Sequence, residues 1–149
     1  MSESIEGVMF VPRRVIPGAQ GEVRRVLKST DPEFSVDALP FGEAYISILY
    51  PDFRKDWKLH TTCVSRLAVL QGTIEFALYD MRENSSTYRQ YQRMSVGDEN
   101  YGLLVIPEGV AATWRNVSPG NTMILNIATL PHDPVESKII PFDEIEFVW

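Results

Sequence analysis

The stretch LAVLQGTIEFALY, residues 67–79, carries two short apolar runs on either side of a turn at Gly72. In the second run Ile74, Phe76 and Leu78 occupy every other position, so they fall on one face of an extended chain. Short alternating runs bounded by turn residues are typical of β-strands. This stretch therefore predicts β-structure with one apolar face.

The same pattern extends outward in both directions. Strands are predicted over residues 43–50, 57–62, 103–106 and 123–128, with Gly, Pro, Asn and Asp clusters between them. The run 103–106 is apolar throughout, which predicts a strand buried on both faces. Strands without a helical layer must cover their own apolar faces, and a two-sheet sandwich or a closed jelly roll does so. Such folds place ligand sites in the mouth of the barrel.

Length and charge narrow the function classes. The chain has 149 residues, so we expect one domain over residues 1–149. Its net charge of -6 disfavours nucleic acid and an anionic membrane as partners, because both need a dense basic surface. No apolar run reaches the length needed to span a membrane. A local basic pocket for one small anionic ligand remains compatible with this charge.

Cysteine usage bears on the compartment. Cys63 is the single cysteine of the sequence, so no internal disulfide forms and a reducing compartment is favoured. It lies in an apolar-leaning run, which predicts a buried structural thiol. The first residues lack the basic-then-apolar pattern of a signal peptide, and we expect a cytoplasmic protein.

Three segments in order resemble the cupins related to dTDP-4-dehydrorhamnose 3,5-epimerase. They are KDWKLH at 55–60 leading to LAVLQG at 67–72, YDMRE at 79–83 followed by STY at 86–88, and VIPEGV at 105–110. The resemblance covers roughly residues 10 to 149. It implies an all-β double-stranded β-helix, the cupin jelly roll, and a homodimer joined through sheet edges.

The resemblance also implies a chemistry. Enzymes of this family remove a proton next to a sugar ketone and return it on the other face. The reaction needs a general base, usually a histidine oriented by a carboxylate, and a group that stabilises the enolate oxygen. It also needs an acid on the opposite face, typically a tyrosine, and arginines for the diphosphate.

Carried onto this chain, most of these groups are replaced. With Trp57 and Gly72 aligned, the base histidine falls at Lys58 and a phosphate-binding arginine at Lys55, which keeps the charge but lacks the planar fork. The enolate lysine falls near Ser65, with Arg66 beside it.

Two further positions depart from the family pattern, and one admits a second alignment. The histidine after the VIPEGV turn becomes Ala112, and the acid tyrosine falls near Asn126. Leu59-His60 also resembles the family's Leu-His at the base position, two residues further on. A two-residue shift keeps the same strand face, so Lys58 and His60 are both predicted to point into the barrel.

These considerations predict a site and leave its activity open. His60 or Lys58 is the candidate base and Tyr45 the candidate acid. The predicted ligand-binding residues are Lys55, Arg66, Asn126 and Glu43.

Three functions remain compatible with this site. The first is a sugar-nucleotide epimerase or isomerase. The second is a non-catalytic cupin that binds a small anionic ligand or serves as a partner subunit. The third is a structural dimer with an occluded barrel. A cupin metal site needs histidines where this chain has Lys58 and Ala112, so neither a metal nor a cofactor is expected.

Overall fold

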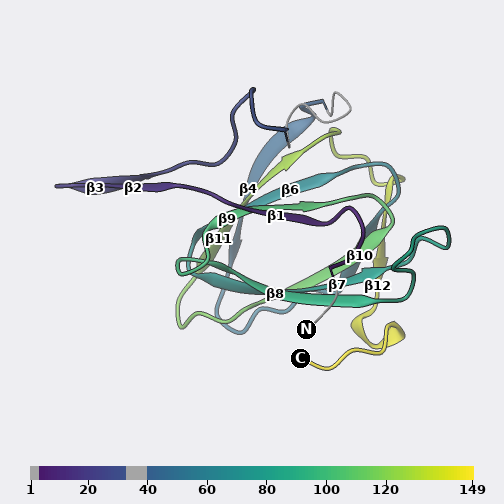
Figure 1. Ribbon diagram of the computed structural model, residues 1–149. Coiled ribbons are helices and arrows are strands. Elements are labelled where there is room, and N and C mark those ends of the chain that lie inside the picture. Colours follow the sequence, from purple (N-terminus) through teal and green to yellow (C-terminus); the bar gives the residue numbers. More distant parts are fainter. Residues whose placement is uncertain (1–3, 33–39) are drawn as a thin grey trace.

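The computed structural model describes residues 4–32 and 40–149 and shows two five-stranded antiparallel sheets that face each other (Figure 1). The first sheet has the order β1 (Met9–Pro12), β9 (Gly102–Ile106), β6 (Ser65–Gln71), β11 (Thr122–Ala128) and β4 (Glu43–Leu49). The second has the order β12 (Ser137–Ile140), β5 (Trp57–His60), β10 (Val110–Asn116), β7 (Thr73–Asp80) and β8 (Tyr91–Gly97). This is the predicted jelly roll. A separate hairpin, β2 (Val15–Gly18) and β3 (Gly21–Arg24), projects from the body.

The turn at Gly72 carries the chain from one sheet to the other, because β6 belongs to the first sheet and β7 to the second. Gly72 has a φ of 77°, in the left-handed region. A Cβ atom there would lie 2.5 Å from Cγ2 of Thr122, so a larger residue would clash as well as strain the backbone. The sheet-to-sheet crossing therefore requires glycine at this position.

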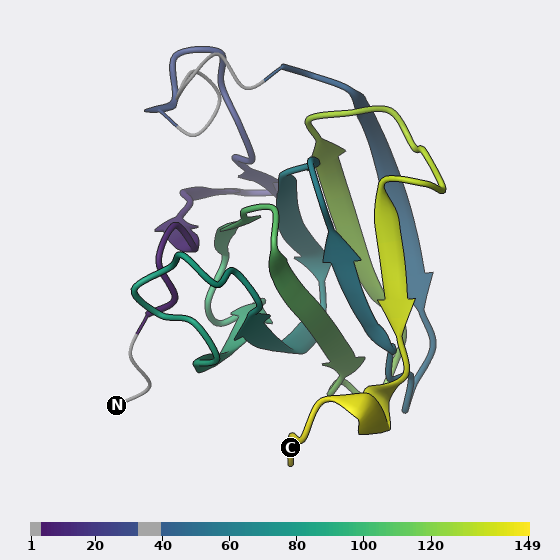
Figure 2. The ribbon, with the colours of Figure 1, turned by 90° about the vertical axis from the view of Figure 1, so that its right-hand side faces the viewer.

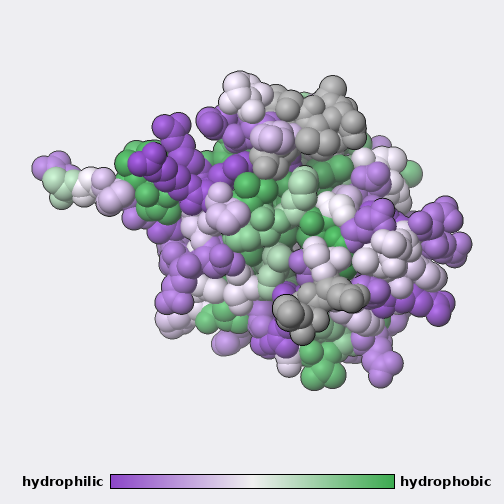
Figure 3. All heavy atoms as spheres, viewed as in Figure 1, coloured by the Kyte–Doolittle hydropathy of each residue, from purple (hydrophilic) through white to green (hydrophobic). Residues whose placement is uncertain are grey.

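The main core lies between the two sheets. Ile74, Phe76 and Leu78 are all fully buried in it, which confirms the alternation predicted for this strand. All five residues of β9 are buried, as predicted for residues 103–106. Seen along one end of the barrel, apolar residues gather over the middle of the face and polar residues surround them (Figure 3).

Segments outside the sheets cover much of their outer faces. The C-terminal segment runs beneath the second sheet (Figure 2). There Phe142 and Phe147 pack on Trp57 at ring-centroid distances of 6.0 and 5.8 Å. Val26 and Leu27 pack against the outer face of β6 and β9. None of the described segments forms a helix with the length and apolarity to cross a membrane.

Candidate functional site

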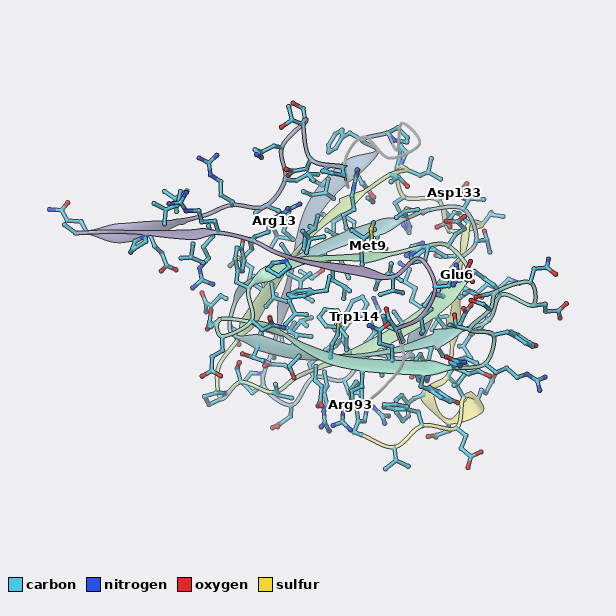
Figure 4. The ribbon with its side chains drawn as sticks, viewed as in Figure 1. Glu6, Met9, Arg13, Arg93, Trp114 and Asp133 are labelled. Atoms are coloured by element: carbon cyan, nitrogen blue, oxygen red, sulfur yellow. The ribbon has the colours of Figure 1, made fainter. Side chains whose placement is uncertain are left out.

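A cavity opens between the two sheets, at the end of the barrel where β4 and β11 face β5 and β10. It encloses about 540 Å³ of empty space, counting the part open to solvent. Trp114 projects into the space between the sheets (Figure 4). The cavity is lined by Tyr45, Ser47, Lys55, Lys58, His60, Ser65, Leu67, Ile106, Pro107, Val110, Ala112, Trp114, Ile124 and Asn126.

Strand β5 separates its side chains as the alternation predicted. Lys58 and His60 line the cavity, whereas Trp57 and Leu59 pack into the apolar cluster on the other face of the sheet. Lys58 lies opposite Ala112 of β10, the position that the family resemblance assigned to a histidine. The central geometric expectation is therefore confirmed: both candidate bases point into the barrel.

His60 is paired with a carboxylate that the sequence analysis missed. Nδ1 of His60 lies 2.6 Å from Oε1 of Glu136, which comes just before β12. The other oxygen of Glu136 accepts hydrogen bonds from the backbone N–H groups of Thr61, Thr62 and Cys63 at 2.9 to 3.0 Å. The carboxylate is thus held by the backbone of the loop that follows β5. No local motif marks Glu136, because strand pairing between β12 and β5 brings it to His60.

The hydrogen bonds define the protonation state of this pair. Burial alone would raise the pKa of Glu136, but the hydrogen bonds from His60, Thr62 and Cys63 outweigh it and lower the pKa to about 2. An ionised carboxylate can only accept, so Nδ1 of His60 carries the hydrogen and Nε2 keeps its lone pair. Burial lowers the pKa of His60, against the opposing effect of Glu136, and the charges of Lys58 and Lys55 lower it further. The imidazole is therefore neutral at neutral pH and suited to act as a base.

Lys55 lies deep in the cavity, with its ammonium nitrogen 3.9 Å from the ring centroid of Trp114. Burial and the nearby charge of Lys58 lower the pKa of Lys55 to about 8. The group is still charged at neutral pH, and Lys55 and Lys58 give a cationic lining to a pocket in an acidic chain.

Tyr45 and Asn126 line the cavity from the sheet opposite His60. They are directly paired neighbours on β4 and β11. The side-chain nitrogen of Asn126 donates a hydrogen bond to the Tyr45 hydroxyl at 2.9 Å. The predicted acid and the residue at the family's tyrosine position thus form one unit.

Two predicted binding residues lie elsewhere. Glu43 lies at the mouth of the cavity, beside Lys58, His60 and Glu136. Arg66 was expected to line the pocket, and the structure corrects this. It alternates with Ser65 and so points away from the cavity, where it donates to the backbone oxygens of Ile127 and Pro40.

Histidine, cysteine and glutamate side chains meet at one point. Potential ligand atoms of His60, Cys63 and Glu136 all lie within 4.8 Å of one another. Hydrogen bonds already engage both carboxylate oxygens of Glu136, and the Cys63 thiol is buried. This geometry serves to orient the histidine.

Comparisons with known proteins agree with this architecture. The family model described as dTDP-4-dehydrorhamnose 3,5-epimerase matches residues 58–149. The spore coat polysaccharide biosynthesis protein SpsL of Bacillus subtilis is 32% identical over 113 residues, covering 73% of this chain and 75% of that protein. The crystal structure of a dTDP sugar isomerase from Desulfovibrio desulfuricans G20 has a TM-score of 0.91 and 34% identity, covering 97% of this chain and 92% of that one.

A more distant structure shares the fold. The dTDP-4-dehydrorhamnose 3,5-epimerase of Bacillus anthracis, solved with TDP and PPi bound, has a TM-score of 0.84 at 15% identity, covering 96% of this chain and 85% of that one. The family model spans more than half of the chain, and two relatives exceed 30% identity over most of it. The chain therefore belongs to the dTDP-4-dehydrorhamnose 3,5-epimerase family.

Proposed function

We propose that this protein is an epimerase of a 4-keto sugar nucleotide and that His60 is its general base. The observation that carries the proposal is the 2.6 Å contact between Glu136 and His60, whose side chain lines the cavity between the two sheets. An oriented, neutral histidine is the group needed to remove a proton next to a ketone. Of the two candidate bases, His60 is the one with a carboxylate partner in the described part of the chain.

The proposed reaction uses both walls of the cavity. His60 on β5 takes a proton from a carbon beside the ketone, and Tyr45 on β4 returns one from the opposite wall. The charge of Lys58, next to His60 on the cavity side of β5, stabilises the oxygen of the enolate formed between the two steps. Lys55 binds the phosphates, and Asn126 and Glu43 contact the sugar.

The ligand class rests on charge and on the relatives. Lys55 and Lys58 give the cavity the cationic lining that a diphosphate requires. The Desulfovibrio relative is a dTDP sugar isomerase, and the Bacillus anthracis structure holds TDP. We therefore propose a dTDP-linked 4-keto-6-deoxy sugar as the ligand.

Solvent exchange tests the proposal. The protein is incubated in D₂O with dTDP-4-keto-6-deoxyglucose, and deuterium at C3 and C5 is followed by NMR. We expect exchange with the wild type and a loss of about 10²–10⁴-fold in His60→Gln. Glu83→Gln is the control, because Glu83 is exposed in the loop between β7 and β8, away from the cavity, and this variant should exchange like the wild type.

Thermal melting with the same sugar nucleotide separates the alternatives. A rise in the melting temperature without exchange would favour the non-catalytic cupin. If the protein shows neither exchange nor a rise in melting temperature, the result would favour a purely structural protein.

Two further properties belong to this proposal. The exposed outer face of β4 supports a homodimer, because Ile46 is 53% and Ile48 46% exposed on an edge strand. The buried free thiol of Cys63, the single cysteine of the sequence, supports a reducing compartment, and we propose the cytoplasm.

A further inference from the structure

The carboxamide of Asn126 is buried and only half satisfied. The residue is 6% exposed and lines the cavity. Its nitrogen donates to the Tyr45 hydroxyl, whereas its oxygen is buried without a hydrogen-bond partner among residues 4–32 and 40–149. A buried carbonyl left unpaired is costly, so an unpaired one inside a cavity points to a ligand group that donates to it.

The bond between the two side chains fixes the direction of the tyrosine hydrogen. An amide N–H can only donate, so it occupies a lone pair of the phenol oxygen and leaves the phenol hydrogen unused. Within the described residues, the Tyr45 hydroxyl makes no other hydrogen bond. The O–H of Tyr45 is therefore available to a ligand in the cavity. The same N–H also stabilises the phenolate that remains once this proton has left.

We infer that Asn126 is a positioning residue that makes Tyr45 a proton donor rather than an acceptor, while its carbonyl oxygen accepts a hydroxyl of the sugar. This inference rests on the proposed function. Residue 126 is the position that the family resemblance assigned to the acid tyrosine. Here the hydroxyl comes from the neighbouring strand, and Asn126 holds it from the original position.

The proton balance of the step is complete. The C–H bond beside the ketone breaks, Nε2 of His60 gains the proton, and the electron pair moves onto the ketone oxygen as an enolate. The O–H bond of Tyr45 then breaks as a new C–H bond forms on the opposite face. At the end of this step His60 is an imidazolium and Tyr45 a phenolate. His60 then gives one proton to water and Tyr45 takes one from water, which restores both side chains. Exchange thus requires His60 alone, whereas inversion also requires Tyr45.

This difference supplies a readout that a merely structural role would not change. In Asn126→Asp the carboxylate accepts the Tyr45 hydrogen and turns it away from the cavity. We expect the ratio of inversion to deuterium exchange, measured at saturating substrate so that a weaker sugar contact does not affect it, to fall about 10²-fold. Tyr45→Phe should show the same separation, and His60→Gln should lose both activities. Asn84→Asp, on the exposed loop after β7, is the matched control for the added charge.

Asn126→Ala repeats the test without adding a charge, and melting curves of both variants verify that they fold. Equal loss of exchange and inversion in folded Asn126 variants would overturn the inference. Unchanged inversion in these variants would overturn it as well. Neither of these results contradicts the proposed epimerase function. A wild type that shows no exchange at all would instead overturn the proposed function and, with it, this inference.

Discussion

At the scale of single residues, the proposed activity depends on which nitrogen of His60 carries the hydrogen. Glu136 selects the form with the hydrogen on Nδ1, because its ionised carboxylate can only accept. Since the pKa of His60 lies below its ordinary value, the base is uncharged throughout the neutral range. A proton blocks this base only at acidic pH, below the range in which an ordinary histidine titrates.

Glu136→Gln should therefore abolish the proposed activity without weakening ligand binding. Three backbone N–H groups require an acceptor, so the amide oxygen takes their side and the amide NH₂ faces Nδ1 of His60. The hydrogen then moves to Nε2, which can no longer accept a proton. We expect kcat/KM to fall about 10²–10⁴-fold with little change in affinity for dTDP, measured by exchange rates and calorimetry.

The same variant also has a stability signature. The pKa of Glu136 is lowered in the fold, so the charged form contributes stability that is fully present above about 4.5 and is lost as the pH falls toward 2. The stability gap between wild type and Glu136→Gln should narrow across that interval in denaturant melts. A Glu136→Gln enzyme with wild-type exchange would contradict the role given to this carboxylate.

At the scale of elements, the loop between β7 and β8 is built around one buried carboxylate. Asp80 is fully buried and accepts hydrogen bonds from Arg82, Ser85 and Thr87 at 2.6 to 2.8 Å. Arg82 also donates to the backbone oxygen of Glu6, which ties the N-terminal segment to this loop. The segments YDMRE at 79–83 and STY at 86–88, which carry part of the family resemblance, thus have a structural role here, away from the cavity lining.

Asp80→Asn should destabilise the fold and spare the chemistry. The amide loses the charge that matches Arg82, and its NH₂ faces donors. We expect a cost of about 3 kcal/mol, which for a chain of this size lowers the melting temperature by roughly 6–12 °C. The exchange rate at 25 °C should stay within twofold. Asp143→Asn, at an exposed carboxylate, is the control, and equal melting temperatures for the two variants would refute this account.

At the scale of the whole molecule, residues 4–32 and 40–149 leave the apolar outer face of β4 uncovered. The outer face of the second sheet is packed by the C-terminal segment, and that of β6 and β9 by Val26 and Leu27. The outer face of β4 has no such cover among the described residues and exposes Ile46 and Ile48. A second copy of the chain would bury this face and pair the free edge of β4.

The double variant Ile46→Asp/Ile48→Asp should therefore dissociate the protein. We expect the wild type to sediment at about twice the chain mass of 16.9 kDa and the variant at 16.9 kDa, because the charges cannot be buried in an apolar interface. Val148→Asp, at a valine that is 86% exposed in the C-terminal segment on the opposite sheet from β4, should remain dimeric. A monomeric wild type would show that the face has another purpose.

Much of this architecture could be predicted from local patterns. The alternation of Ile74, Phe76 and Leu78 and the continuous apolar run of β9 depend only on how neighbouring side chains alternate along an extended strand. The same rule placed Lys58 and His60 together inside the barrel. The prediction for Arg66 was wrong because it relied on the alignment, whereas the same alternation assigns Arg66 to the outer face.

The sequence by itself determined strands β4, β5, β6, β7, β9 and β11 and the side chains of β5 that face inward, because these follow from periodicity within a few residues. The family resemblance selected the jelly roll from the folds that this pattern allows. Only the tertiary structure decided that Glu136 pairs with His60 and that Asn126 is hydrogen-bonded to Tyr45. Those partners are 76 and 81 residues apart, and strand pairing brings them into contact. Periodicity says which way a side chain points, whereas the register between distant strands decides what it meets.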